Sequence, residues 1–250
     1  MEKNKKISLA ILNLNEIVSL RIILPKLLKY RYLVDEIIAI DGGSTDGSKE
    51  FLIKNKIKVI DQNKKYSSFE ITYLKKNIMD AYWLGIKKAQ FNNVIIPFTP
   101  DGNMMPKHLP KLIKKIKQGY EMVIVSRYKD NAKSYDDTLV TGFGNYMFTK
   151  IVNLLFSGNF TDLMGGYRCV NKNLFKEFKI NRSNLTIAIH TQLAIGCIRS
   201  KKKYIEISGN EPKRIAGKAQ VNPLINGLWE VFIIIEAYLK KNLYKSKKKI

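Results

Sequence analysis

The feature that most constrains the fold is a short apolar run that ends in a carboxylate and is followed at once by a turn. Residues 35–48 read Asp-Glu-Ile-Ile-Ala-Ile-Asp-Gly-Gly-Ser-Thr-Asp-Gly-Ser. Such a run, followed by turn residues and then by a helical pattern, is typical of a buried strand that feeds a loop. In open α/β sheets, ligands bind at the carboxyl ends of the strands. We therefore expect Asp41 at the mouth of a binding site.

A second strand of this kind is predicted about sixty residues further along the chain. Residues 93–103 read Asn-Val-Ile-Ile-Pro-Phe-Thr-Pro-Asp-Gly-Asn, so that Asp101 and Asn103 follow an apolar run. Carboxylate and amide oxygens at this spacing are ligands that hard cations prefer, which points to a nucleotide bound through a metal. Pro-Asp-Gly-Asn is also a favourable β-turn by propensity alone, and a turn without a ligand remains the alternative.

Strand and helix patterns alternate along the first half of the chain. This alternation predicts an α/β fold with a mostly parallel, Rossmann-like sheet and helices on both faces. We expect strands at 7–13, 36–41, 57–61, 93–98, 122–126 and 203–207, and helices at 16–29, 46–55, 70–89, after Pro106, and at 142–157 and 186–199. The Gly- and Lys-rich stretch 209–220 has no periodicity and is predicted to be a mobile loop.

The expected organisation is one catalytic domain over residues 1–221, with a donor half at about 1–127 and an acceptor half at about 128–221. Residues 222–250 are expected to form an amphipathic helix and a basic tail. The apolar segment 224–239 is interrupted by polar residues, so it suits the surface of a membrane better than its interior. The tail lysines are Lys240, Lys241, Lys245, Lys247, Lys248 and Lys249. A soluble, frayed tail is the alternative.

The formal net charge of +23 favours phosphate-bearing partners, namely nucleotides, anionic lipids or nucleic acid. Cys169 and Cys197 have no metal-binding spacing and are expected to be reduced, buried thiols of a cytosolic protein. The apolar run near the N-terminus stops at Asn13, and we interpret it as the first strand and not as a signal peptide.

At these strand ends the chain resembles family 2 glycosyltransferases of the GT-A fold, especially the branch that includes dolichyl-phosphate mannose synthase. The resemblance runs from about Ile7 to Gly227 and rests on five ordered segments. It implies transfer of a sugar, with inversion, from a nucleotide-diphosphate sugar to a polyprenyl phosphate or a lipid-linked glycan. It further implies Mg²⁺ or Mn²⁺ as the cofactor and a peripheral location at the cytoplasmic face of a membrane, as part of cell-surface glycan synthesis.

The resemblance also assigns the donor site. The donor nucleotide is expected on the first two strand ends, where Asp41 contacts the base or ribose; the matching residues are Asn13, Asn15, Glu16, Asp41, Gly43 and Ser44. A helix cap made by Ser44 or Asp46 is the structural alternative. Asp101 and Asn103 match the family's metal segment. Thr99 stands where the family has its first Asp, which weakens the expected metal site.

Arginines that match family positions are expected to hold the diphosphate, because guanidinium groups fit phosphate geometry. These are Arg127, Arg168 and Arg214, the last within a phosphate loop that also contains Lys213, Gly217 and Lys218. Asp162 is the candidate catalytic base, or else it orients Arg168 in an ion pair. A phosphate acceptor is already ionised and needs no base. His190 is expected to be a hydrogen-bonded structural residue.

Two rival functions remain open from the sequence. A basic nucleic-acid-binding protein would interleave aromatic and basic residues on one platform. The aromatic residues here fall mostly inside apolar runs, which suits packing, so nucleic acid is disfavoured as a partner. A sugar-phosphate nucleotidylyltransferase would need a Gly-rich phosphate loop after the first strand, and the residues after Ile11 lack one.

Overall fold

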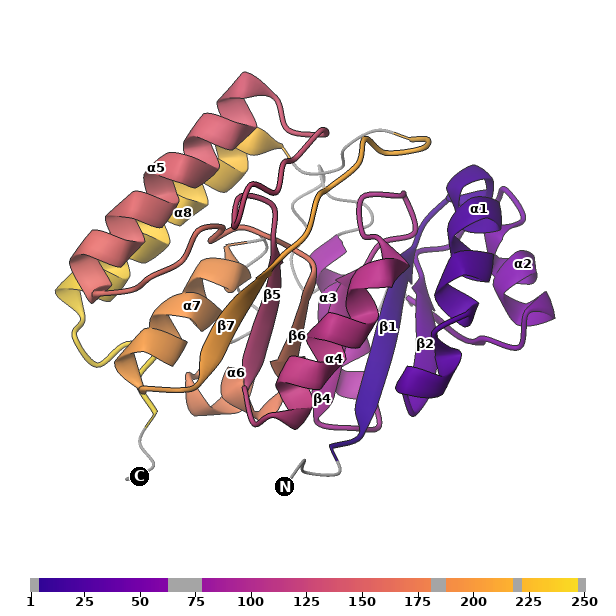
Figure 1. The fold of residues 1–250 in the computed structure, drawn as a ribbon, viewed down its shortest axis with the longest axis horizontal. Helices are drawn as coiled ribbons and strands as arrows, with labels where there is room; N and C mark the ends of the chain where they lie inside the picture. The colour runs from indigo at the N-terminus through magenta and orange to yellow at the C-terminus, as the bar shows by residue number, and fades with distance from the viewer. Residues whose placement is uncertain (1–4, 63–77, 181–187, 218–221, 247–250) are drawn as a thin grey trace.

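A seven-stranded sheet forms the centre of the molecule and helices cover both of its faces (Figure 1). The structure is a computed structural model that describes residues 5–62, 78–180, 188–217 and 222–246. The strands are β1 (Ile7–Asn13), β2 (Glu36–Asp41), β3 (Lys58–Asp61), β4 (Asn93–Phe98), β5 (Met122–Ser126), β6 (Arg168–Asn171) and β7 (Tyr204–Ser208). Their order in the sheet is β3-β2-β1-β4-β6-β5-β7. All pairings are parallel except those of β6, so the mostly parallel sheet is confirmed.

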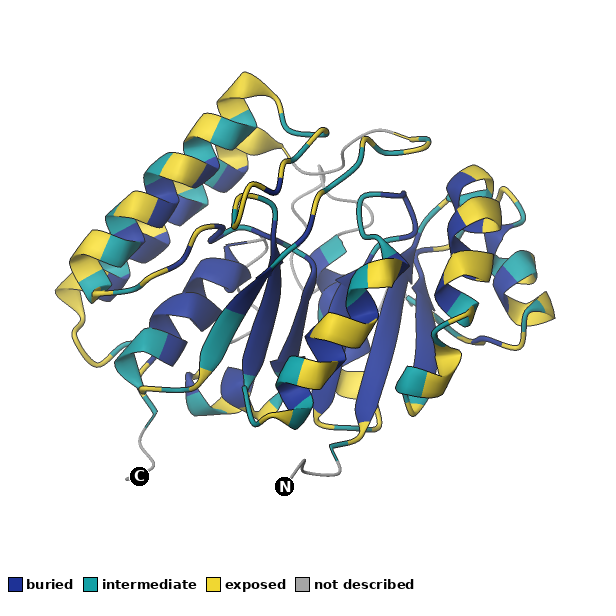
Figure 2. Cartoon of the chain, in the orientation of Figure 1, coloured by how far each residue is buried: buried dark blue, intermediate teal, exposed yellow. Residues whose placement is uncertain are grey.

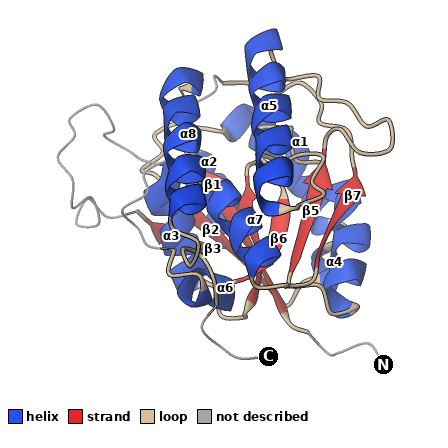
Figure 3. Cartoon of the chain, turned by 90° about the vertical axis from the view of Figure 1, so that its left-hand side faces the viewer, coloured by secondary structure: helices blue, strands red, loops and turns tan. Residues whose placement is uncertain are grey.

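The helices divide between the two faces of the sheet (Figures 1 and 3). Helices α1, α2 and α4 cover one face, and α3, α6 and α7 cover the other, with α5 and α8 side by side outside α7. Their bounds are α1 (Ile17–Leu28), η1 (Arg31–Leu33), α2 (Ser48–Lys54), α3 (Ile78–Lys88), η3 (Pro106–His108), α4 (Leu109–Lys117), α5 (Leu139–Phe156), α6 (Asn173–Glu177), α7 (Ile189–Arg199) and α8 (Pro223–Leu239). The expected beginnings of α3 at 70 and α7 at 186 lie outside the described residues.

Alternate side chains of each strand belong to different cores, as the period of two requires. In β1, Leu9 and Ile11 pack toward α1 and α4, whereas Ala10 and Leu12 pack toward α3. All seven residues of β1 are buried, as expected for a central strand whose two faces are both covered, and five of them are apolar (Figure 2).

Strand β6 is the main element that the sequence patterns did not predict. It contains only four residues, Arg-Cys-Val-Asn, and begins with an arginine, so no apolar run announces it. It enters the sheet between β4 and β5 and runs antiparallel to both. The expected acceptor half therefore contributes a strand to the middle of the sheet, between two strands of the donor half.

The register of the central strands places their polar ends at one edge. Asn13 of β1 lies opposite Asp41 of β2, and Ile11 lies opposite Phe98, the last residue of β4. The turn after Phe98 consequently begins beside the end of β1. The two turns singled out in the sequence thus lie at the same edge of the sheet.

Helix α8 packs against the rest of the described fold. Ile233, Ile234 and Ala237 belong to the core beneath α5 and α7, and Tyr244 beyond the helix is also buried. Among the described residues, no helix combines the length and the apolar character needed to cross a bilayer. The tail residues 247–249 lie outside the described residues.

Candidate functional site

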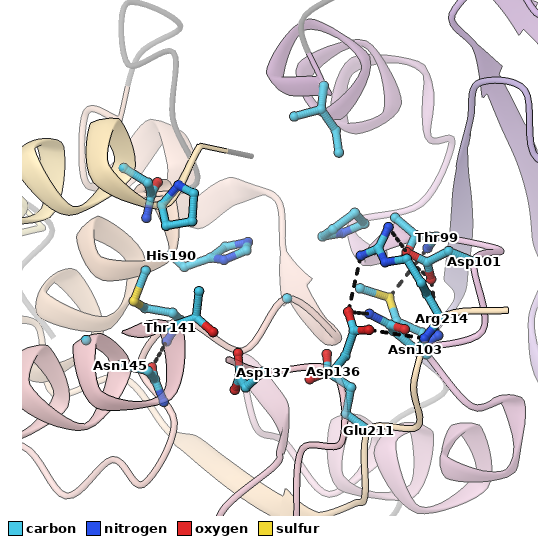
Figure 4. A pocket seen from close by; sticks show the side chains of 18 of the residues that line it. Thr99, Asp101, Asn103, Asp136, Asp137, Thr141, Asn145, His190, Glu211 and Arg214 are labelled. Atoms are coloured by element: carbon cyan, nitrogen blue, oxygen red, sulfur yellow. Dashed lines mark hydrogen bonds and ion pairs between the residues drawn. The ribbon is translucent and has the colours of Figure 1, made fainter. Parts of the chain in front are cut away.

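A cleft of about 950 Å³ opens above the carboxyl ends of β1 and β4 and extends between the N-terminal ends of α5 and α8. Its polar residues come from segments that are far apart in the sequence (Figure 4). The side chains of Asp101, Asn103 and Arg214 lie on one side, and His190 faces them from the other. The cleft therefore joins the expected donor and acceptor halves.

The first turn is organised around the carboxylate of Asp41. Its Oδ1 accepts hydrogen bonds from the main-chain N–H groups of Gly43 and Ser44, both at 2.8 Å. Its Oδ2 accepts from Asn13 Nδ2 and Ser44 Oγ, both at 2.7 Å. Burial favours a raised pKa, but the hydrogen bonds from Ser44, Asn13 and Gly43 outweigh it and lower the pKa of Asp41.

This arrangement corrects the expected role of Asp41. The residue has no exposed surface and does not line the cleft, because its oxygens are engaged by the turn itself. It orients Asn13, whose Oδ1 is buried without a hydrogen-bond partner while the residue lines the cleft. The unsatisfied acceptor that the turn offers to a ligand is thus Asn13 Oδ1 and not the Asp41 carboxylate.

The other expected nucleotide residues support the same turn. Asn15 Oδ1 accepts from the Thr45 N–H at 2.8 Å, and the Asn15 N–H donates to Ser44 Oγ at 3.0 Å. Gly43 has φ +88°, a conformation that favours glycine. Glu16 lines the cleft; burial raises its pKa, despite a hydrogen bond from Ser19. Of these residues, Asn13 and Glu16 reach the cleft, and the others hold the turn in place.

The second turn holds Asp101 at the end of β4. Asp101 Oδ1 accepts from Thr99 Oγ1 and from the Asn103 N–H, both at 3.1 Å. Thr99 therefore contributes a hydroxyl to the turn in the position where the resemblance led us to expect a carboxylate. Asp101 is only 7% exposed and lines the cleft. Its second oxygen, Oδ2, lies 3.6 Å from Nη1 of Arg214.

The loop 209–217 is attached to this turn by its main chain. The Ile215 N–H donates to the Asp101 carbonyl at 2.7 Å, and the Ile215 side chain fills the space over Gly102. Gly102 has φ +103°, and a Cβ there would lie 2.8 Å from Ile215 Cγ1, so only glycine fits. This contact places Arg214 between Asp101 and Asp136. The expected loop residue Lys213 is exposed and outside the cleft, and Lys218 lies outside the described residues.

Asp136 completes the polar side of the cleft. Its Oδ2 accepts from Asn103 Nδ2 at 2.8 Å, and its carboxylate also pairs with the Arg214 guanidinium at 3.3 Å. Burial favours a raised pKa, yet the contacts with Asn103 and Arg214 lower the pKa of Asp136. Asp136 was not among the residues expected at the site. The Asp-Asp pair at 136–137 was the signal that could have identified it.

The oxygen atoms beside Arg214 suit a divalent cation. Asn103 Oδ1 is buried without a hydrogen-bond partner, because Nδ2 is the atom that binds Asp136. Together with the Asp101 carboxylate it forms the oxygen-only donor set that Mg²⁺ and Mn²⁺ prefer, with phosphate oxygens left to complete the shell. Within the described residues no cluster of three or more His, Cys, Asp or Glu side chains is placed to hold a metal. A cation at this point would therefore have few protein ligands, and phosphate oxygens would have to supply most of its shell.

Arg127 lines the cleft but is surrounded by carboxylates. Asp162 receives three hydrogen bonds from Arg127, from Nε at 2.7 Å, Nη2 at 2.9 Å and the main-chain N–H at 3.0 Å. Asp137 and Glu211 each lie 3.3 Å from Nη1. Burial favours a lowered pKa for Arg127, but Asp162 and the other two carboxylates raise it well above its usual value.

The expected catalytic role of Asp162 is corrected by its place in the fold. The residue is fully buried and does not line the cleft. Burial alone would raise the pKa of Asp162, but the Arg127 guanidinium outweighs this effect and lowers the pKa. A carboxylate held ionised by an arginine is a poor proton acceptor. The partner expected for a structural ion pair was Arg168, whereas the observed partner is Arg127.

Arg168 is also removed from the expected phosphate clamp. It is the first residue of β6 and fully buried, and its guanidinium donates to the main-chain carbonyls of Gly165 and Leu163. Burial lowers its pKa to about 10. The side chain fastens the loop that precedes β6 and does not reach the cleft.

The inner end of the cleft contains three buried polar residues from three helices. Asn145 of α5, His190 of α7 and Asn226 of α8 are each at most 3% exposed, and all three line the cleft. Neither ring nitrogen of His190 makes a hydrogen bond of normal geometry. Burial lowers its pKa, and the nearby Met164 main chain opposes this lowering. The hydrogen bond expected of a structural His190 is therefore not formed with normal geometry.

Comparisons with known proteins identify the family of the chain and agree with its fold. The family model described as "Glycosyl transferase family 2" matches residues 8–179. The chain is 20% identical over 192 residues to the glycosyltransferase AglJ of Haloferax volcanii, covering 76% of this chain and 59% of that protein. It is 28% identical over 144 residues to an uncharacterized protein of Methanocaldococcus jannaschii, covering 56% of this chain and 55% of that protein. The chain thus spans less than two thirds of the length of these curated relatives.

The solved structures agree on the fold. The glucosyl-3-phosphoglycerate synthase of Mycobacterium tuberculosis, in complex with Mn²⁺ and UDP-glucose, superposes with a TM-score of 0.65 at 14% identity. The superposition covers 95% of this chain and 80% of the synthase. A second crystal structure, of a mycobacterial protein, has a TM-score of 0.70 at 15% identity and covers 97% of this chain and 76% of that one.

Proposed function

The chain belongs to glycosyl transferase family 2, and from this membership we propose that it transfers a sugar from a nucleotide-diphosphate sugar to an acceptor carried by a lipid. The observation that carries the proposal is the form of the cleft. At one end Asp101, Asn103 and Arg214 converge at strand ends, and at the other the cleft runs out between two helices with apolar faces. A ligand that fills this cleft needs a polar head and an apolar remainder.

The donor nucleotide fits the polar end. Asn13 Oδ1 offers an acceptor for a base or ribose, and the Arg214 guanidinium lies where a diphosphate would meet it. Asp101 and Asn103 would hold Mg²⁺ or Mn²⁺, which would neutralise charge on the leaving diphosphate. The glucosyl-3-phosphoglycerate synthase named above binds Mn²⁺ with UDP-glucose on the same fold. We propose inversion at the transferred carbon, as the family resemblance implies.

The acceptor is proposed to be a polyprenyl phosphate or a lipid-linked glycan because of the exposed faces of α5 and α8. Most of the exposed large apolar side chains of the described chain lie on these two helices, which stand side by side (Figure 3). Leu139, Phe143 and Leu228 are 94%, 66% and 72% exposed. Exposed apolar residues that are scattered singly are common on proteins, whereas these side chains are concentrated on two neighbouring helices. Such a surface suits contact with a lipid bilayer.

Basic residues accompany this apolar surface. Lys150 on α5 and Lys240, Lys241 and Lys245 after α8 are exposed, and each would contribute about 1 kcal/mol of attraction to an anionic lipid surface. We propose that the chain binds the cytoplasmic face of a membrane through the α5/α8 face. A polyprenyl phosphate in that membrane would then reach the cleft from the side where the two helices begin.

The test of transfer uses purified chain, anionic vesicles that contain a polyprenyl phosphate, and UDP-, GDP-, CDP- and dTDP-sugars with and without Mg²⁺ or Mn²⁺. We expect one donor to be consumed and a glycolipid to form. Asp101→Asn should lower kcat/KM by about 100-fold, since it removes a charge that acts on the diphosphate through the metal. Asp61→Asn, at the exposed end of β3, is the matched control. Absence of nucleotide binding and turnover across the panel would refute the proposal.

The membrane contact is tested separately by sedimentation with vesicles. Phe232→Glu and Ile235→Glu change exposed residues of α8 outside the cleft and should abolish binding to anionic vesicles. Ile53→Glu makes the same change on α2, on the other side of the molecule, and should bind like wild type. Equal binding by all variants would show that the α5/α8 face is not the lipid-binding surface.

A further inference from the structure

The inner end of the cleft contains buried hydrogen-bonding atoms that the folded chain leaves without partners. They are Asn145 Nδ2, both ring nitrogens of His190, and Asn226 Oδ1. Leaving a buried polar atom unsatisfied costs about 1–3 kcal/mol, so several together indicate that something else supplies the missing bonds. All three residues line the cleft, which makes that partner a ligand or water.

The unpartnered atoms include both hydrogen-bond donors and hydrogen-bond acceptors. Asn145 Oδ1 accepts from the Met164 N–H at 3.1 Å, which fixes the amide so that Nδ2, a donor, is free. Asn226 Oδ1 is an acceptor, and neutral His190 offers one donor and one acceptor. Hydroxyl groups both donate and accept, so neighbouring hydroxyls on one ring can satisfy all of these atoms. A lipid tail would satisfy none of them.

The charges around this group argue against a phosphate. His190 is neutral, because burial and then the neighbouring Arg168 charge lower its pKa well below its usual value. Arg127, which also lines the cleft, is already balanced by Asp162, Asp137 and Glu211. Glu230, which follows Asn226 by about one turn of α8 and is buried, would repel an anion if it were ionised. A neutral ligand is the chemistry that fits.

The position of His190 connects this group with the donor end of the cleft. Three side chains meet at Gly166. A Cβ added to this glycine would lie 3.9 Å from His190 Cε1, 3.9 Å from Pro97 Cγ and 3.3 Å from Met104 Cε. Pro97 and Met104 flank the Asp101 turn. The polar group therefore borders the segment that holds Asp101, across the cleft from Arg214 (Figure 4).

From this placement we propose that Asn145, His190 and Asn226 form a neutral subsite that binds the hydroxyl groups of the sugar being transferred. The subsite rests on the proposed function, since it assumes a nucleotide sugar whose diphosphate lies near Asp101 and Arg214. It adds a specific claim, namely that recognition of the sugar comes from three helices outside the strand-end turns. The apolar positions further out, among them Phe143 and Leu228, remain for the acceptor.

The test compares each nucleotide sugar with its own nucleoside diphosphate by calorimetry, using the UDP, GDP, CDP and dTDP pairs and the full chain. In the pair that binds, His190→Phe should lower the affinity for the nucleotide sugar by about tenfold or more and leave the nucleoside diphosphate unchanged. Asn226→Leu should act in the same direction. His190→Gln, which keeps a donor and an acceptor, should restore part of the affinity.

The second histidine of the chain provides a matched control. His108 also has a buried Nε2 without a partner, but it does not line the cleft. His108→Phe should leave both affinities unchanged, and thermal unfolding verifies that each variant is folded. Nucleotide-sugar binding by wild type together with unchanged binding by His190→Phe and Asn226→Leu would overturn the subsite and leave the proposed function standing. An effect of the variants on the KM for the acceptor alone would also overturn it. Failure of wild type to bind any nucleotide sugar would refute both.

Discussion

The ion pair between Asp162 and Arg127 allows a sharp test of whether Asp162 is a structural residue or a catalytic base. The change is Asp162→Asn, which keeps the shape of the side chain and removes its charge. Wild-type Asp162 is fully buried and accepts three hydrogen bonds from Arg127. The amide of the variant has one acceptor oxygen where the wild-type carboxylate has two, so at least one of the three hydrogen bonds is lost. Its NH₂ group then faces the N–H groups of Arg127, so that two donors oppose each other.

The expected loss of stability follows from burial and from the remaining partners of Arg127. Breaking a buried ion pair by removing one partner costs about 3–5 kcal/mol. Asp137 and Glu211, each 3.3 Å from Nη1, still balance the arginine, which places the expected loss near the lower limit, at about 3 kcal/mol. For a chain of this size, that corresponds to a fall in Tm of about 6–12 °C.

The pH dependence provides a second measurement. The pKa of Asp162 is lowered in the folded state, so its contribution is present above the unfolded pKa of about 3.9 and is lost as pH falls through the folded value. The difference in stability between wild type and Asp162→Asn should therefore be constant from pH 6 to pH 8 and shrink below about pH 4.

The assay is denaturant unfolding at several pH values, with Asp137→Asn as the matched control. Asp137 pairs with the same guanidinium but is partly exposed, so its change should cost less than about 1 kcal/mol. Equal stability of Asp162→Asn and wild type at pH 7 would refute the ion-pair reasoning. If that stable variant also lost transfer activity, Asp162 would regain its place as a candidate base.

Three further changes test other parts of the structure. Burial raises the pKa of Glu230 to about 7, so its contribution to stability is present below about pH 4.5 and is lost as the pH rises through 7. In urea unfolding, Glu230→Gln should therefore be about 3 kcal/mol more stable than wild type at pH 8. At about pH 4 the two proteins should be equally stable. A Cβ at Gly196 would lie 2.3 Å from Phe178 Cδ2, so Gly196→Ala should lose about 1–3 kcal/mol in thermal unfolding. Arg214→Ala should weaken nucleoside diphosphate binding about tenfold by calorimetry, whereas Lys213→Ala, outside the cleft, should change it much less.

The strand-end turns could be predicted from the sequence because their signals are local. An apolar run followed by Gly, Ser and Asp fixes a strand and its turn, and the period of two then fixes which side chains face each core. Parallel pairing aligns the strand ends, so Asn13 and Asp41 become neighbours although 28 residues separate them. Asp101 lies at the cleft for the same reason.

The roles of the carboxylates could not be predicted, because they depend on distant partners. Asp162 meets Arg127 across 35 residues, and Asp136 meets Arg214 across 78. No local pattern encodes either distance. A carboxylate at a strand end can bind a ligand or hold a turn, and only the count of its hydrogen-bond donors separates the two. Asp41 accepts from three donors of its own turn and from Asn13 at the end of β1, whereas Asp101 keeps an oxygen that no donor of its own turn occupies.

The charge of the cleft indicates whether a metal ion is needed there, a question on which composition and motif point in opposite directions. The chain as a whole is strongly basic, yet five carboxylates and two guanidinium groups line the described cleft, namely Glu16, Asp101, Asp136, Asp137, Glu211, Arg127 and Arg214. A nucleoside diphosphate would add further negative charge, and Arg127 is already balanced. Thr99 stands where the resemblance leads us to expect a carboxylate, but the excess of acidic groups in the cleft still favours a bound cation. We therefore expect EDTA to weaken nucleoside diphosphate binding about tenfold or more and Mn²⁺ to restore it, as measured by calorimetry. Binding of equal strength in EDTA would mean that Arg214 alone replaces the metal.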